Sequence, residues 1–446
     1  MLHLIVSAAL MSTPPALGQT SDKHLSAVME RCVASRAPVE QIASCNDVIG
    51  SGRLTTDEMV KAYFSRAFAY AHSGDTKRAI SDYSEAIRLT PDYGAALVFR
   101  GLTYMGTGDH QHALADFNEA IRLDPSDAQA YNARAGAHQM SGDRQHAIAD
   151  LGEAIRLKPN YAEAYRNRAL LYVAAGSLPP ALADFSQVIR LKPNDPATYD
   201  DRGVTFVRLG DHQHAIADLS EAIRLKPDNA HAYNIRGAAY VGLKDYRHAI
   251  ADFNEALRLN VADPEAHANR AAAYEMSGDH QRAIEDLGEV IRLNPNFGNA
   301  VMDRGRVLAR LGRYQEALAD FDHAAEIKPE NAEAHNSACW LRAANLGKQL
   351  DRARAECDLA IKLDPKNPSF RDSRGLIGLK QKRFQDAWND YDAAARMDPK
   401  RASFLYGRAM AELGLGQRDK AEADIAAAKT LDRGISDAYA GYGIKP

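Results

Sequence analysis

The sequence has no run of eighteen or more apolar residues beyond its N-terminus, and it has no excess of basic residues. A helix that crosses a bilayer needs about 20 mainly apolar residues, so no transmembrane segment is predicted. The 55 basic and 59 acidic residues give a formal net charge of −4. Surfaces that bind nucleic acids carry a marked positive excess, so this balance argues against a nucleic-acid partner.

The short motifs of common catalytic and cofactor sites are also missing. There is no glycine-rich phosphate loop, no HExxH motif and no evident Ser/His/Asp arrangement. Two His-x-His pairs, His110/His112 and His212/His214, each follow an Asp at an expected helix start, and no further ligand stands at a fixed spacing. We therefore predict no catalytic residue, no cofactor and no metal site.

The sequence does contain one segment that recurs along the chain. GDHQHALADFNEAIRLDP ends at Pro125, and similar segments end at Pro159 and Pro227. Between Pro91 and Pro227 a proline recurs every 34 residues. A fixed period of about 20 to 50 residues is typical of a stacked array of repeats.

Each repeat is predicted to be a helix, a turn and a second helix. In the repeat 125–158, Tyr131 and Ala135 recur at helical spacing on the first segment, and Ala147 and Leu151 on the second. Gly or Ala stands at the place of Ala135 in most repeats, and Ala at the place of Ala147. Small side chains at both places allow the two helices to approach closely.

These residues resemble the tetratricopeptide repeat, which has a period of about 34 residues. The family pattern is fully present in the repeat 227–260, as Tyr233, Gly237, Tyr240, Ala249, Phe253 and Ala256. The resemblance covers about residues 57–432. It implies an all-α fold, a right-handed α-solenoid superhelix of about eleven helix pairs with an atypical N-terminal capping pair. It also implies a concave face, lined by the first helices, that usually binds a peptide or helix of a partner protein.

The chain divides into four expected regions. Residues 1–20 resemble a secretory signal peptide, although their first part lacks Lys and Arg. Residues 21–56 are expected to form an atypical capping pair of helices, Lys23–Ala34 and Val39–Ile49. Residues 433–446 form a short tail with one or two helical turns. Between them the repeats are 57–90, 91–124, 125–158, 159–192, 193–226, 227–260, 261–294, 295–328, 329–364, 365–398 and 399–432.

The only four cysteines fall in two local pairs. Cys32 and Cys45 lie in the capping pair. Cys339 and Cys357 occupy the small-residue and aromatic places of the one interior repeat with two extra residues, which we place near the turn, around 345–350. These places are within bridging reach, so we predict the disulfides Cys32–Cys45 and Cys339–Cys357.

Two other interpretations of the cysteines are possible. All four could be buried thiols that serve as small apolar residues. Cys339 could instead be a nucleophile, with His335 on the same helix face. Paired cysteines persist in oxidising compartments, so we expect a periplasmic or secreted protein, with a cytoplasmic adaptor as the alternative.

Arg and Asp also recur in step, Arg just before the small residue of the first helix and Asp on the second helix. Arg134 and Asp150 are one such couple. We interpret the two series as ion pairs within or between repeats; the alternative is a ladder of Arg that binds an anion.

Three rows of residues on the first helices are expected to line the concave face. From about 98 to 241 they are mostly small and apolar, which suits an extended peptide or a partner helix with apolar anchors. Part of this strip could instead serve helix packing. The expected partner-binding residues are Val98, Leu102, Met105, Asn132, Gln139, Arg166, Leu170, Val173, Asp200, Val204, Val207, Asn234 and Val241.

The sequence therefore predicts a non-catalytic scaffold that binds an unidentified protein or peptide. The alternative is an array that supports a redox or catalytic role through the repeat with Cys339 and Cys357.

Overall fold

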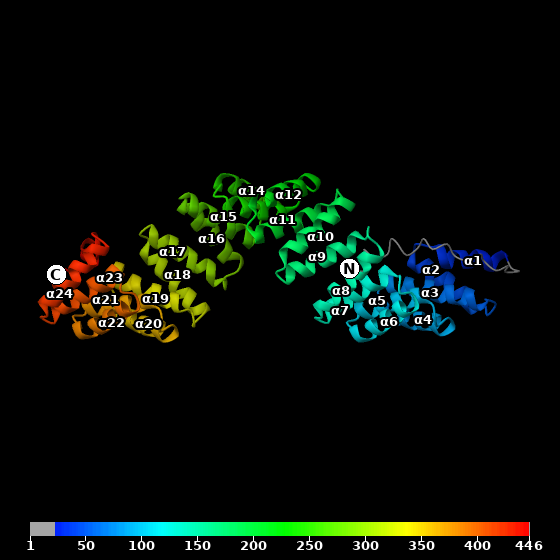
Figure 1. Cartoon of the computed structure of the whole chain (residues 1–446), viewed down its shortest axis with the longest axis horizontal. Coiled ribbons are helices and arrows are strands. Elements are labelled where there is room, and N and C mark those ends of the chain that lie inside the picture. Colours follow the sequence, from blue (N-terminus) through cyan, green and yellow to red (C-terminus); the bar gives the residue numbers. More distant parts are fainter. Residues whose placement is uncertain (1–22, 446) are drawn as a thin grey trace. The chain divides into compact units, whose positions relative to one another are not determined.

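The computed structural model describes residues 23–445, and in this range the chain is all-helical, without strands (Figure 1). The expected signal peptide, residues 1–20, lies outside the described residues. The chain divides into two compact units, one that ends at Leu209 and one that begins at Gly210.

The first unit is a stack of helix pairs that begins with the capping pair. Helices α3 and α4, α5 and α6, α7 and α8, and α9 and α10 pack as pairs, and each pair contacts the next. The helices are α1 (Lys23–Ala34), α2 (Pro38–Gly50), α3 (Thr56–His72), α4 (Thr76–Leu89), α5 (Gly94–Gly106), α6 (His110–Leu123), α7 (Ala128–Met140), α8 (Arg144–Leu157), α9 (Ala162–Ala174), α10 (Leu178–Leu191) and α11 (Pro196–Leu209).

The second unit continues the same construction, with pairs from α13 and α14 to α23 and α24. A short helix, α25, follows the last pair. The elements are α12 (His212–Leu225), α13 (Ala230–Gly242), α14 (Tyr246–Leu259), α15 (Pro264–Ser277), α16 (His280–Leu293), α17 (Gly298–Arg310), α18 (Tyr314–Ile327), α19 (Ala332–Trp340), the π-helix η2 (Leu341–Leu346), α20 (Leu350–Leu363), α21 (Pro368–Lys380), α22 (Phe384–Met397), α23 (Ala402–Gly414), α24 (Arg418–Leu431) and α25 (Ile435–Gly441).

An Asp N-cap precedes many of the second helices. Asp109 accepts a hydrogen bond from the backbone N–H of His112, and its second oxygen lies 2.7 Å from His112 Nδ1. The bond from the backbone N–H is the largest cause that holds the pKa of Asp109 below its ordinary value. The backbone N–H and the ring Nδ1 of His214 make the same two contacts with Asp211. The second His of each His-x-His pair therefore serves an exposed helix start.

Close contact inside each pair follows from the small residue of the first helix. A Cβ added to Gly237 would lie 2.6 Å from a ring carbon of Phe253, and one added to Gly101 would lie 2.7 Å from Phe117. Both rings are fully buried. In these two repeats the aromatic residue of the second helix thus fills the space that the glycine leaves.

Ion pairs join the two helices of most repeats, as the matching Arg and Asp series predict. Arg Nε and Nη2 donate to the two oxygens of an Asp sixteen residues later, in the same repeat, and the Asp is at most partly exposed. Nη1 of several of these arginines reaches back to the previous repeat, as Arg134 does to Asn118. The pairs are Arg66–Asp82, Arg100–Asp116, Arg134–Asp150, Arg168–Asp184, Arg236–Asp252, Arg270–Asp286, Arg304–Asp320, Arg374–Asp390 and Arg408–Asp424.

The repeat 329–364 breaks this pattern. Ala338 stands in the Arg place and Glu356 in the Asp place, where Glu356 pairs with His335 at 2.6 Å. The two extra residues were predicted near the turn, but they lengthen the first helix, which continues through η2. A π-helix absorbs extra residues because each turn holds more of them than an α-turn. From η2 the buried Arg342 donates to Asp322 of the preceding repeat at 2.8 Å.

A buried carboxyl group with a raised pKa lies in the C-terminal repeats. Asp372 on α21 is buried, and its Oδ2 accepts a hydrogen bond from Ser403 Oγ at 3.1 Å. Burial raises the pKa of Asp372 to about 6, against the lowering effects of Ser403 and Arg401. Above pH 6 the folded chain therefore holds an ionised carboxylate out of water.

Replacing Asp372 with Asn should stabilise the C-terminal repeats at pH 7.5. Between about pH 4 and pH 6 the folded state binds more protons than the unfolded state, so the stability of the native chain falls as the pH rises through this window. A rise of about two pKa units corresponds to about 3 kcal/mol at most. Amide hydrogen exchange in α21 and α23 should be slower in the variant than in the native chain at pH 7.5. At pH 4.5 most of this difference should vanish, and an equal difference at both pH values would contradict the assignment.

Candidate partner-binding surface

The expected groove residues of the first row lie mostly inside the stack. Val98, Asn132 and Asn234 are 8%, 7% and 3% exposed. Asn132 Oδ1 accepts a hydrogen bond from Asn167 Nδ2 at 3.1 Å, and Asn269 makes the same bond to Asn234. These bonds join consecutive first helices. Packing between repeats therefore covers most of these three side chains, and their contact with a partner stays a prediction.

The other rows are partly buried by the second helix of the same repeat and by the next first helix. Leu102 and Met105 pack on the cluster around Phe117, and a Cβ on Gly136 would lie 3.3 Å from Met105 Cε. Val173 packs beside Phe185 and Val241 beside Phe253 in the same manner. These side chains of the strip therefore take part in helix packing and stay partly exposed.

The polar members of the strip divide between internal pairing and exposure. Arg166 donates to Asp201 at 2.7 Å, and burial nevertheless raises the pKa of Asp201. Gln139 and Leu170 are exposed, Leu170 by 39%. Asp200, Val204 and Val207 have intermediate exposure on α11. Among the predicted residues, Gln139 and Leu170 are the most open to a partner.

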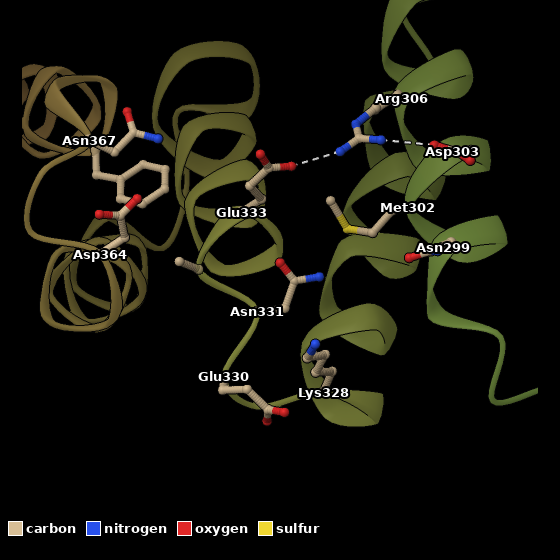
Figure 2. Close-up of a pocket in the computed structure, with 12 residues that line it drawn as sticks. Asn299, Met302, Asp303, Arg306, Lys328, Glu330, Asn331, Glu333, Asp364 and Asn367 are labelled. Atoms are coloured by element: carbon tan, nitrogen blue, oxygen red, sulfur yellow. Dashed lines mark hydrogen bonds and ion pairs between the residues drawn. The ribbon is translucent and has the colours of Figure 1, made fainter. Parts of the chain in front are cut away.

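A pocket of about 610 Å³ lies further along the first helices, in the second unit (Figure 2). It opens between α17, α19 and α21. Met302 and Arg306 continue the rows of Val98 and Leu102, so this pocket is on the face that the repeat pattern assigns to partners. Its lining residues are Asn299, Met302, Asp303, Arg306, Lys328, Glu330, Asn331, Ala332, Glu333, Asp364, Asn367 and Phe370.

The pocket combines an apolar floor with a charged rim. Met302 and Phe370 are 4% and 2% exposed. Figure 2 shows Arg306 between two carboxylates, with Nη1 2.8 Å from Asp303 and Nη2 2.8 Å from Glu333. Four carboxylates and two basic groups line the pocket, so the rim has an acidic excess.

Side-chain amides complete the rim. Asn331 accepts a hydrogen bond from the backbone N–H of Ala334, and Asn367 accepts one from Ser369, so both cap a helix through the carbonyl oxygen. Capping fixes the position of each amide and leaves its NH₂ group as a donor. Asn299 adds a third, exposed amide. Amide donors and acceptors on a fixed rim can pair with the backbone of an extended segment.

The two cysteine pairs lie at disulfide distance. The Cα atoms are 4.7 Å apart for Cys32 and Cys45 and 5.7 Å apart for Cys339 and Cys357. All four residues are fully buried, so a reagent in solution reaches none of them while the helix pairs stay closed. Cys339 and Cys357 stand where Gly and Phe meet in other repeats, and the pair links the same two helices.

His335 does not activate Cys339. Its Nδ1 lies 2.6 Å from Glu356 and its Nε2 lies 2.9 Å from the carbonyl oxygen of Pro329. Both ring nitrogens are therefore engaged elsewhere. Over residues 23–445 no group of three or more His, Cys, Asp or Glu side chains is arranged to hold a metal ion. None of the helices described there has the length and apolar character to cross a bilayer.

The helix pairs, their period and the pocketed face of the first helices define an α-helical repeat protein. One tetratricopeptide repeat family model matches residues 64–128, 99–143, 133–196, 236–296 and 374–438, and a second matches 178–239 and 270–338. The first alone covers more than half of the chain. The chain belongs to the tetratricopeptide repeat family, whose members are typically non-catalytic and bind protein partners.

Several solved structures are similar to this chain over part of its length. The crystal structure of MamA is 27% identical, covers 37% of this chain and 96% of its own, and has a TM-score of 0.35. A tetratricopeptide repeat protein from Parabacteroides merdae is 19% identical over 55% of this chain and 97% of its own, with a TM-score of 0.44. YrrB, described as having an unusual peptide-binding site, is 17% identical over 41% of this chain and 95% of its own, with a TM-score of 0.38. No curated protein sequence matches the chain significantly.

The sequence analysis did not predict the pocket. One signal was present: the row that starts at Leu102 is small or apolar as far as Ala272 and turns polar at Arg306. The acidic residues Glu330 and Glu333 then follow at the start of the next first helix. A change from apolar to polar rows on one face would have indicated a different local surface, although not its hollow shape.

Proposed function

We propose that this chain is a non-catalytic scaffold that binds a segment of a partner protein in the pocket between α17, α19 and α21. The observation that carries the proposal is the 610 Å³ pocket on the first helices, with a buried apolar floor and an acidic, amide-bearing rim. This combination suits an extended segment or a helix end with one apolar anchor and a neighbouring basic side chain.

We also propose that the protein works in the periplasm or outside the cell. Two buried cysteine pairs at disulfide distance support this location, because disulfides persist in oxidising compartments. The exposed part of the predicted strip, around Gln139 and Leu170, remains a second candidate contact for a long partner segment.

Adding positive charge to the acidic rim of the pocket should weaken partner binding. Asn299→Arg and Glu333→Arg both add positive charge beside the pocket, and a basic partner segment should then bind about tenfold more weakly or worse. The measurement is quantitative mass spectrometry of proteins captured from the envelope fraction by each variant. The matched control is Gln315→Arg, which adds the same side chain to an exposed position on α18.

The native chain and Gln315→Arg should enrich the same partner, and both pocket variants should lose it. Circular dichroism should show unchanged helix content, since Asn299 and Glu333 are exposed. A partner that all four proteins retain equally would place the binding site elsewhere.

A further inference from the structure

The C-terminal segment, residues 435–445, packs onto the first helices of the last repeats. Tyr439 on α25 is only 2% exposed, and its ring lies 4.9 Å from that of Tyr406 on α23. Its hydroxyl donates to the backbone carbonyl of Ser403 at 2.7 Å and lies 3.3 Å from the hydroxyl of Tyr391. The helix α25 itself therefore covers the last helix pair of the stack.

The residues after α25 reach much further back. The ring of Tyr442 stands edge-on to that of Trp340 on α19, with ring centres 5.3 Å apart. Tyr442 and Ile444 also pack against the cluster of Cys339, Ala343, Cys357 and Leu376. The same two side chains touch the cluster of Leu379, Tyr406 and Met410. The segment therefore contacts three repeats, 329–364, 365–398 and 399–432, and not only its neighbour.

A helix-ending turn gives the segment one apolar face. Gly443 has φ +82°, and Ile444 N–H donates to the carbonyl of Tyr439 at 3.0 Å. Tyr439 and Tyr442 are three residues apart, so they lie on the same side of the helix. The turn brings Ile444 to that side as well. The result is a compact array of two aromatic rings and one branched aliphatic side chain.

The receiving surface belongs to the rows that the repeat pattern assigns to partners. Trp340, Leu376 and Met410 occupy the place that Leu102 holds in its repeat, and Leu379 occupies the place of Met105. The C-terminal segment thus lies where a partner segment is expected.

We propose that the face formed by α19, α21 and α23 binds short helical segments with two aromatic residues three positions apart, and that the C-terminal segment closes it until such a segment displaces it. This extends the proposed function to a second surface beside the pocket and rests on the scaffold role. The closure depends on the docked state, because α25 has seven residues and an isolated helix of that length is not stable in water. Tyr442 and Ile444 are only partly buried, so this end opens most easily.

The test uses the chain's own segment as the ligand. A fluorescent peptide of residues 433–446 is titrated, with anisotropy as the readout, into the native chain and a chain that ends at Gly434. The truncated chain should bind the peptide, and the native chain should bind it at least tenfold more weakly, because its face is occupied. A peptide with Tyr442→Ala should lose most of its affinity for the truncated chain.

A milder variant covers the case in which truncation disturbs the last repeats. Tyr442→Ala with Ile444→Ser in the full chain leaves Tyr439 in place and should admit the peptide more readily than the native chain does. The proposal is overturned if the peptide binds neither the truncated chain nor this variant, or if it binds the native chain equally well. Because the assay contains no partner, such a failure leaves the proposal for the pocket standing.

Discussion

Replacing Arg374 with Ala should destabilise the C-terminal repeats by about 3 to 5 kcal/mol, the range for a broken buried ion pair. Arg374 Nε and Nη2 donate to the two oxygens of Asp390 at 2.8 and 2.6 Å, and Nη1 donates to Asp358 of the preceding repeat at 2.6 Å. Asp390 is only 5% exposed. The variant leaves its carboxylate buried without its partner, and this accounts for most of the loss.

Denaturant unfolding followed by tryptophan fluorescence measures this effect locally. Both tryptophans of the chain, Trp340 and Trp388, lie in the C-terminal repeats. The matched control is Arg383→Ala, since the Arg383–Asp386 pair is about half exposed and spans one helical turn. Such a pair contributes about 0 to 1 kcal/mol. Equal losses in Arg374→Ala and Arg383→Ala would contradict a structural role for the Arg–Asp series.

A second variant separates two costs: the unpaired buried carboxylate of Asp390 and the loss of the ion pair itself. Arg374→Ala combined with Asp390→Asn removes the buried carboxylate together with its partner. The double variant should recover part of the stability that Arg374→Ala loses, because an amide costs less to bury than a charge. An anion-binding ladder predicts a different result, in which the Arg variants alter anion affinity with little change in stability.

Reducing the Cys339–Cys357 pair should cost about 3 kcal/mol, the value expected for a closed loop of about this length. The two residues are 18 positions apart, and both are fully buried between α19 and α20. Without the bond, the unfolded ensemble gains freedom while the folded packing stays nearly the same. The midpoint of denaturant unfolding, read from Trp340 beside Cys339, should fall when dithiothreitol is added.

The control is the double variant Cys339→Ala with Cys357→Ala, whose midpoint should not respond to dithiothreitol. It should retain partner capture, whereas a redox or catalytic role of this repeat requires that the function is lost while the fold persists. Mass spectrometry without reduction adds a direct test of the bonds. Four free thiols in protein from its native compartment would contradict both disulfides and weaken the case for export.

The sequence predicted the regular parts of the fold well, because they depend on local and repeated features. The period, the glycine turns and the matching Arg and Asp series all follow from residues that recur at fixed spacing. The helix expected over Lys23–Ala34 has those bounds, and the second helix of the cap, expected over Val39–Ile49, is Pro38–Gly50. Short-range spacing and capping residues determine such elements.

The sequence did not predict how successive first helices pack, and this packing determines which of their side chains are exposed. Nothing in the single repeat indicates that Asn132 pairs with Asn167, or that Met105 closes on Gly136. The π-helix after Trp340 was also missed, since extra residues can extend a helix or a turn with similar cost. The ring contact between Tyr442 and Trp340 joins residues about a hundred positions apart, which no local pattern reveals.

Site-specific photo-crosslinking tests the central claim, that a partner segment lies in the pocket between α17, α19 and α21. A photoreactive benzoylphenylalanine replaces Asn299 on the rim in one protein and Gln315 on α18 in another, both exposed positions. On irradiation in cells, the protein labelled at 299 should form a discrete crosslink to a partner, and Glu333→Arg should abolish it. Crosslinks of equal yield from positions 299 and 315, or from 315 alone, would contradict the claim.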